Sequence, residues 1–227
     1  MVRVLGIETS RQLCSAALLV DGTVREDTRK MARAHNEHIL GLVDGLVAAA
    51  GVAPQDLDGI AFGCGPGSFT GVRIAASVAQ ALALGAGASV APVSSTRALA
   101  VAAIEQRAVE DGVVVSIRSR RDAFYLASFS IADGEPAVQR PDQLLAACPD
   151  WGDFAQGWPL AGDPPPWLPA DASVLCEVTV GAGLIARLGA RAFAEGRGLD
   201  PELGLPAYVQ GDSPWRPADG EAAARLN

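Results

Sequence analysis

The chain has 227 residues, of which 49% are hydrophobic and 19% charged, and its 26 acidic and 18 basic side chains leave a formal net charge of −8. A charged fraction below the roughly 25% of average soluble proteins excludes a disordered chain and predicts a packed fold of one large or two small domains. The acidic excess argues against a protein that binds nucleic acid on its own, because neutralising phosphates takes a local excess of Lys and Arg.

The lysine and cysteine content excludes further classes. Lys30 is the single lysine, so a Walker-type phosphate loop or a Schiff-base lysine is excluded at every other position. The four cysteines are far apart and form no C-x-x-C pattern, which indicates buried thiols in a reducing compartment. No apolar targeting segment follows the N-terminus, and we expect an untargeted cytoplasmic protein without a membrane span.

The first predicted elements are three strands, with a hairpin turn between the second and the third. Residues 2–8 and 14–20 are apolar runs, and Asp21-Gly22 is a strong hairpin signal. Apolar positions at helical spacing predict a helix over residues 35–50. In chain order we then expect a buried strand, a helix, a strand and a helix at residues 59–63, 70–86, 89–93 and 95–107.

The second half of the chain begins as the first does. Residues 113–118 and 123–138 repeat the pattern of residues 2–8 and 13–24, so that Ile7 matches Ile117. We interpret this as a duplication of an α/β unit that opens with an antiparallel meander, with a chance coincidence of common strand and turn pieces as the alternative.

The rest of the chain is less regular. A stretch rich in Pro and Trp over residues 148–173 predicts little secondary structure, and a helix is expected at about 180–195. We place the two α/β subdomains at residues 1–108, the partner-binding one, and 109–205. A polar tail over residues 206–227 either packs back or is partly disordered.

The segment with the most information is GCGPGSFTGVRI over residues 63–74, between a predicted strand and helix. The N-terminus of a helix at this point favours binding of an anion. The spacing of the glycines, however, matches no dinucleotide fingerprint, Walker loop or G-x-S-x-G nucleophile turn. On physical grounds alone the segment is a tight turn in which Ser68 or Thr70 caps the helix.

This segment also carries a family resemblance. The run GPGSFTGVRI, an opening strand that ends in I-E-T-S and a helix that begins near A-H-x-x-H-I-L resemble the TsaB (YeaZ) family of bacterial tRNA threonylcarbamoyladenosine (t6A) biosynthesis, over most of residues 1–130. The resemblance implies an α/β chain with the duplicated actin-like, Hsp70 and sugar-kinase (RNase H-like) fold, in two subdomains with mixed sheets. The internal repeat agrees with it.

The resemblance also implies a residual nucleotide-like cleft, with no required cofactor and weak ATP or ADP binding at most. Acids at the ends of the two equivalent first strands serve phosphate and Mg²⁺ in this superfamily, and here these positions hold Glu8 and Arg118. Because an arginine repels Mg²⁺, we expect a non-catalytic paralogue of TsaD with no metal site. The residues that would shape the cleft are Glu8, Thr9, Ser10, Gly65, Gly67, Ser68, Thr70 and Gly71.

The histidines and one basic cluster are further candidate sites. His35 and His38 share one helix face, and since a metal would need a third ligand, we expect solvent-facing or helix-capping imidazoles. Arg118, Arg120 and Arg121 form either a solvated turn or a contact for tRNA phosphates.

The helix over residues 70–86 is apolar almost all round, with Arg73 its only charged residue. Such a helix is buried on more than one side, either wholly in its own core or between the core and a partner. The family pairs with TsaD through its N-terminal helices and self-pairs when alone. The residues that we expect at this interface are His38, Leu42, Leu46, Val72, Ala75, Ala79 and Leu82.

The function implied by the resemblance is that of a scaffold subunit that pairs with the TsaD transferase, recruits the TsaE ATPase and reaches tRNA only through the complex. Two enzyme classes are the alternatives, an ATP-dependent phosphotransferase and a glycoprotease-like peptidase. A homodimeric binding module unrelated to tRNA is a third.

Overall fold

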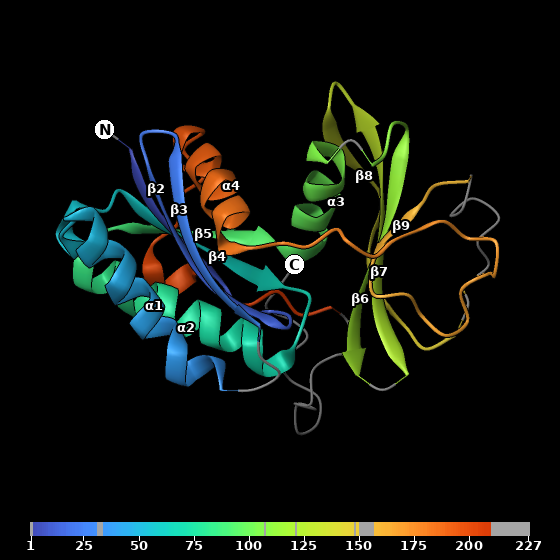
Figure 1. Cartoon of the computed structure of the whole chain (residues 1–227), viewed down its shortest axis with the longest axis horizontal. Helices are drawn as coiled ribbons and strands as arrows, with labels where there is room; N and C mark the ends of the chain where they lie inside the picture. Colours follow the sequence, from blue (N-terminus) through green and yellow to red (C-terminus); the bar gives the residue numbers. More distant parts are fainter. Residues whose placement is uncertain are drawn as a thin grey trace, which may run out of the picture.

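The computed structural model describes residues 2–30, 34–106, 108–120, 122–147, 149 and 157–209. These residues form two lobes, each built on a five-stranded mixed sheet (Figure 1). We call them lobe I, with strand order β3-β2-β1-β4-β5, and lobe II, with order β10-β9-β6-β7-β8. The predicted fold class, a duplicated α/β chain with two mixed sheets, is confirmed.

The strands of lobe I combine an antiparallel meander with two parallel strands. The register runs β1 against β2 and β2 against β3 antiparallel, while β4 and β5 lie parallel to β1. The β2–β3 turn has positive φ at both Asp21 (46°) and Gly22 (83°), as the hairpin signal predicted. The strand bounds are β1 Arg3–Glu8, β2 Leu13–Val20, β3 Thr23–Lys30, β4 Gly59–Gly65 and β5 Ser89–Ser94.

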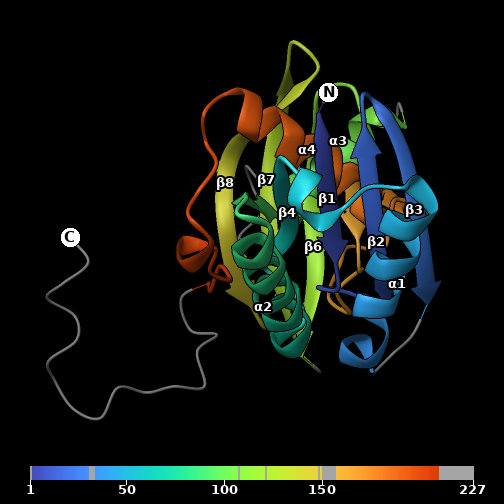
Figure 2. The ribbon, with the colours of Figure 1, turned by 90° about the vertical axis from the view of Figure 1, so that its left-hand side faces the viewer.

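Helices cover both faces of this sheet. Figure 2 shows α1 (His35–Ala50) and α2 (Phe69–Ala86) side by side on one face, and α4 (Ala182–Ala194) packs on β1 and β4 from the other. Because both faces are covered, β1 is buried from Val4 to Glu8. Leu5 and Ile7 pack with α1 and α2, while Val4 packs on the α4 side. Within the described ranges, α2 alone is long and apolar enough to span a membrane.

Lobe II repeats the meander. β6 (Gly112–Arg120), β7 (Ala123–Ala132) and β8 (Glu135–Leu145) pair antiparallel in sequence, and their hairpin turn at Asp133-Gly134 again has positive φ at both residues. The predicted duplication is therefore confirmed. The remaining elements are β9 Leu160–Gly162, β10 Val174–Leu175, α3 Ser95–Glu105, and the short 3₁₀ turns η1 Pro54–Asp56 and η2 Pro201–Leu203.

Two helices pack across the predicted subdomain boundary at residue 108. α3, which precedes it, packs chiefly on the sheet of lobe II, whereas α4, from the predicted C-terminal unit, packs on the sheet of lobe I (Figure 1). The chain therefore crosses between the lobes twice. The prediction was wrong because hydrophobic periodicity marks a buried helix face without saying which sheet covers it.

The start of the predicted tail packs back onto lobe I. The Ala207 N–H donates to the Cys64 carbonyl oxygen at 2.8 Å, and Leu199, just before the tail, forms an antiparallel bridge with Val90. Tyr208 contacts the first turn of α2, where its hydroxyl accepts a hydrogen bond from Arg73 Nε at 2.8 Å. Residues 210–227 of the predicted tail lie outside the described residues.

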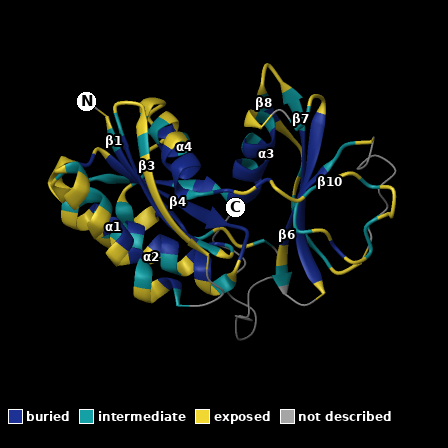
Figure 3. Cartoon of the chain, viewed as in Figure 1, coloured by how far each residue is buried: buried dark blue, intermediate teal, exposed yellow. Residues whose placement is uncertain are grey.

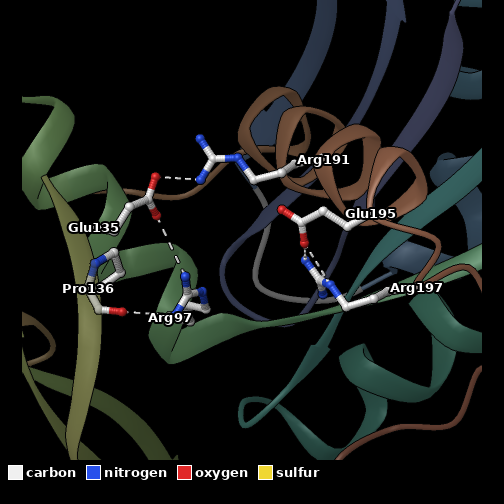
Figure 4. A network of polar contacts seen from close by, with 6 residues as sticks. All are labelled: Arg97, Glu135, Pro136, Arg191, Glu195 and Arg197. Carbon is white, nitrogen blue, oxygen red and sulfur yellow. Dashed lines mark hydrogen bonds and ion pairs between the residues drawn. The ribbon is translucent and has the colours of Figure 1, made fainter. Parts of the chain in front are cut away.

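Ion pairs join the two lobes on the side of α4 (Figure 4). Arg191 of α4 donates to Glu135 at the start of β8, and the same carboxylate lies 3.6 Å from the guanidinium of Arg97 in α3. Arg187 of α4 also pairs with Glu105 of α3 at 2.6 Å. All five side chains are between 43% and 53% exposed, so each pair contributes about 0–1 kcal/mol at most.

Candidate functional site

The glycine-rich loop is bound to the end of β1. The Ser68 N–H donates to the Ser10 carbonyl oxygen at 2.7 Å, and the Thr9 hydroxyl donates to the Gly71 carbonyl oxygen at 2.8 Å. The Ser68 hydroxyl accepts from the Gly71 N–H, so Ser68 rather than Thr70 caps α2. Residues 8–10 and the loop thus form one hydrogen-bonded unit.

The glycines of the loop make this close packing possible. A Cβ placed on Gly67 would lie 2.6 Å from the Ser10 carbonyl oxygen, and one on Gly71 would overlap the Thr9 carbonyl oxygen. A Cβ on Gly63 would overlap the Glu8 carboxylate. The space that these glycines leave is filled by the protein's own residues 8–10, so they do not form an open cradle for a phosphate.

Glu8 is almost completely buried, at 1% exposure. Its Oε1 accepts the Ser10 N–H, while its Oε2 has no hydrogen-bond partner. Burial raises the pKa of this carboxyl, because an ionised carboxylate is costly away from water. The group is therefore poorly suited to offer charge to a ligand outside.

A pocket of about 1220 Å³ lies between the lobes. It is lined by the β1–β2 turn, the end of β3, the starts of α1 and α2, the end of β6 and residues 163–164 and 179–180. Of the eight predicted cleft residues, Ser10, Ser68, Thr70 and Gly71 line this pocket. The other four, Glu8, Thr9, Gly65 and Gly67, are buried behind it and are not among its lining residues, which corrects their predicted place.

Arg118, the counterpart of Glu8, lines the pocket and is exposed. Its backbone N–H donates to Asp163 Oδ2 at 2.9 Å, and Asp163 Oδ1 pairs with Arg11 of lobe I at 2.9 Å. The superfamily's Mg²⁺-bound nucleotide does not fit these residues, because the acid at one strand end is buried and the other strand end presents a guanidinium.

Sequence analysis did not single out Arg11, Lys30 and Asp163 as pocket residues, although all three line it. They belong to separate segments, and no local pattern brings them together. For the predicted basic cluster, Arg118 is placed at the pocket, whereas the side chain of Arg120 and all of Arg121 lie outside the described residues. The choice between a solvated turn and a tRNA contact stays a prediction.

The histidines differ from expectation. His35 is buried at 8% exposure, with its Nε2 unpartnered, and burial lowers its pKa; His38 is half-buried. The prediction of a solvent-facing or helix-capping imidazole was wrong for His35, because it is buried against the body of lobe I and α1 begins without a side-chain cap hydrogen bond. Within the described ranges no group of three His, Cys, Asp or Glu side chains could hold a metal.

The buried thiol of Cys64 is a poor nucleophile. Burial, with a smaller effect of the nearby Glu8 charge, raises the pKa of Cys64 to about 12. At neutral pH it is therefore a neutral thiol, which is the unreactive form. Cys14 is also buried, as expected, and Cys176 is exposed, contrary to expectation.

The outer faces of α1 and α2 are open to solvent (Figure 3). Among the residues predicted at an interface, His38, Leu46 and Leu82 are partly exposed. The other four, Leu42, Val72, Ala75 and Ala79, are at most 3% exposed and pack in the core of lobe I, so they are not available to a partner. That prediction was wrong because the apolar surface of α2 was assigned without knowing which face the sheet occupies.

The sequence analysis did not predict the apolar side chains that are exposed on the outer faces of α1 and α2. Leu84 of α2 is 77% exposed and Leu40 of α1 is 54% exposed. Gly41 and Gly45 of α1 and Ala81 of α2 are also exposed. We call these five residues the outer helix face. A helical wheel would have found it, had the direction of the sheet been known.

Known proteins resemble this chain along its whole length. The TsaB protein of Escherichia coli, a tRNA threonylcarbamoyladenosine biosynthesis protein, is 31% identical over 97% of this chain and 100% of its own length. The chain belongs to the TsaB family. The structure of YeaZ from Pseudomonas aeruginosa matches with a TM-score of 0.78 and 32% identity, covering 92% of this chain and all of that one.

This chain is also similar to the transferase TsaD. The family model described as TsaD, tRNA N6-adenosine threonylcarbamoyltransferase, matches residues 27–146. The transferase of Maricaulis maris is 41% identical over 105 residues, which cover 37% of this chain and 28% of that protein. Similarity to TsaB thus extends from end to end, whereas similarity to the transferase is confined to part of both chains.

Proposed function

We propose that this chain is a non-catalytic scaffold subunit of the cytoplasmic machinery that makes t6A on tRNA. It pairs with a TsaD-type transferase, recruits a TsaE-type ATPase and contacts tRNA only through the complex. The observation that carries the proposal is the end-to-end similarity to TsaB, against the partial similarity to the transferase. The buried carboxyl of Glu8 and the arginine at the matching strand end support a non-catalytic role.

We assign the outer helix face to pairing. Leu40 and Leu84 expose apolar surface on adjacent helices of lobe I, and the small residues Gly41, Gly45 and Ala81 would let the helices of a partner approach closely. A similar transferase fold can present equivalent helices, and a second copy of this chain would use the same face when the partner is absent. The first contact is therefore expected to be helix against helix.

Two substitutions test this assignment. Leu84→Glu places a charge on the outer helix face, and pairing would then bury it without a partner, at a cost of several kcal/mol. Val138→Glu is the matched control, because Val138 is 57% exposed on β8 of lobe II. In sedimentation velocity, Leu84→Glu should lose self-pairing and its complex with the TsaD-type protein, while Val138→Glu should keep both.

The role in t6A synthesis is tested separately in cells. Depleting this chain should lower the t6A content of tRNA, measured by mass spectrometry of nucleosides, and Val138→Glu should restore it better than Leu84→Glu. Unchanged t6A after depletion would overturn the function. Turnover of ATP or a peptide by the purified chain alone, abolished by Glu8→Gln, would overturn the non-catalytic role and favour an enzyme.

A further inference from the structure

An arginine near the start of α2 is held in place by two aromatic rings. The guanidinium carbon of Arg73 lies 3.4 Å from the ring centroid of Phe69 and 5.4 Å from that of Tyr208. The two ring centroids are 6.4 Å apart, and the Tyr208 hydroxyl accepts a hydrogen bond from Arg73 Nε at 2.8 Å. Stacking on the rings and the bond to Nε together fix the plane of the guanidinium. Its orientation is therefore set before a partner binds.

The outer end of this guanidinium is unused in the part of the chain that the structure describes. Arg73 makes a hydrogen bond there only through Nε, and no described carboxylate lies within ion-pair distance of it. The residue is exposed to solvent. By contrast, the four arginines on the side of α4 all pair with a glutamate, and they are Arg97, Arg187, Arg191 and Arg197. Arg73 thus keeps two nitrogens with which it can bind an anion.

Arg73 lies on the side of α2 that continues the outer helix face. Arg73, Ser77, Ala81 and Leu84 are all exposed. They follow one another at spacings of four, four and three residues, which places them along one side of a helix. Arg73 and Leu84 are then about 16 Å apart along the helix axis, at a rise of about 1.5 Å per residue. A protein that packs on the outer helix face can therefore reach Arg73 from the same helix.

The charges near Arg73 favour a carboxylate of a protein over the phosphates of a nucleic acid. The neighbouring helix α1 exposes Glu37 and Asp44 and contains no Lys or Arg. Two exposed acids would repel a phosphate backbone, whose binding takes several cations. A protein surface, in contrast, can cover the apolar side chains of the outer helix face and place a single carboxylate opposite Arg73.

We propose that Arg73 binds a carboxylate of the TsaD-type partner at the edge of the outer helix face, and that Tyr208 positions Arg73 for it. This inference rests on the proposed pairing function and adds a charged contact to it. The planar guanidinium can donate two parallel hydrogen bonds to one carboxylate through its Nη nitrogens. Because Phe69 and Tyr208 already hold the side chain, little conformational entropy is lost when the contact forms. The start of the tail thereby contributes to pairing through Tyr208.

The test measures binding of the full chain to the purified TsaD-type protein of its own organism, by isothermal titration calorimetry at several salt concentrations. Arg73→Gln should weaken binding about tenfold or more and make it less sensitive to salt, because a charge-assisted contact is lost. Tyr208→Phe keeps the ring and removes only the hydroxyl, so it should weaken binding by a smaller factor. Arg197→Gln is the matched control, because this side chain is 61% exposed beyond the end of α4, on the opposite face of the lobe I sheet. It should change neither the affinity nor the salt dependence.

The possible failures are distinguishable. If the wild-type chain forms no complex, the pairing function is overturned and this inference with it. If the complex forms and Arg73→Gln leaves its affinity and salt dependence unchanged, only this inference is overturned; a lower Tm in that variant would then show that the stack merely fastens the tail to α2. Loss of binding to a tRNA fragment in Arg73→Gln, with the protein complex intact, would assign Arg73 to phosphate and overturn the carboxylate contact.

Discussion

Gly71 provides a sharp test of how the loop is packed. Alanine is favoured over glycine in helices by about 1 kcal/mol, so helix propensity predicts that Gly71→Ala stabilises the first turn of α2. The structure predicts the opposite. The new Cβ would overlap the Thr9 carbonyl oxygen and lie 3.0 Å from the Thr9 carbonyl carbon and 3.2 Å from Ser10 Cα. These are backbone atoms at the end of a buried strand, so α2 has to move away instead.

The size of the effect follows from these contacts. Overpacking against fixed atoms costs about 1–3 kcal/mol, and displacing α2 also breaks the hydrogen bond from the Thr9 hydroxyl to the Gly71 carbonyl, which is worth about 1 kcal/mol. After subtracting about 1 kcal/mol for the helix propensity of alanine, the net loss is about 1–3 kcal/mol. For a chain of this length that lowers Tm by about 2–12 °C.

The matched control is Gly41→Ala in the middle of α1, where a new Cβ meets nothing within 4 Å. It should raise the free energy of unfolding by about 0.5–1 kcal/mol through propensity alone. Urea and thermal unfolding, followed by circular dichroism at one low protein concentration, measure both variants. A Gly71→Ala protein as stable as wild type would refute the packing role of this glycine.

Three further predictions concern stability. Ser15→Ala should lower the free energy of unfolding in urea by about 1–2 kcal/mol, because the buried Ser15 hydroxyl accepts the Ala182 N–H at 2.9 Å and so caps α4. The N-cap residue of α4, Gly181, has no side chain to do this. The control Ser77→Ala, at an exposed position, should change stability very little. Burial raises the pKa of Glu8 in the folded state, so the contribution of Glu8 to stability should fall as pH rises from about 4.5 through the folded pKa. Glu8→Gln keeps the Oε1 acceptor and should remove this fall in the free energy of unfolding, measured from pH 4.5 to 8. Glu135→Gln should lower Tm by no more than about 8 °C, and by less in high salt, because its two ion pairs are exposed and contribute about 0–1 kcal/mol each. A larger, salt-independent loss would contradict this.

Secondary structure was predictable wherever the signal was local. The apolar runs and the turns at Asp21-Gly22 and Asp133-Gly134 predicted both meanders, and helical spacing predicted α1 over its observed bounds. Residues 148–173 were expected to be irregular, and β9, the strand that the structure describes within them, is only three residues long. Such features depend on neighbouring residues, which the sequence contains directly.

The candidate site was predictable only in part, because burial depends on contacts between distant segments. Ser68 and Thr70 were placed correctly beside the pocket, since a strand–loop–helix motif fixes them locally. Glu8 was expected in a cleft, yet the loop closes over it. Arg11, Lys30 and Arg118 line one pocket only because the fold brings three separate segments together.

By itself, then, the sequence determined the duplicated α/β order and the glycine-rich motif that carries the family resemblance. It also determined that Glu8 and Arg118 occupy equivalent positions at the ends of the two first strands. The tertiary structure alone decided which face of α2 stays open and that α4 crosses to lobe I. Ser15 illustrates the physical reason: its hydroxyl caps a helix 167 residues further along the chain. Local pattern records which residues prefer burial, but only the packed fold determines what buries them.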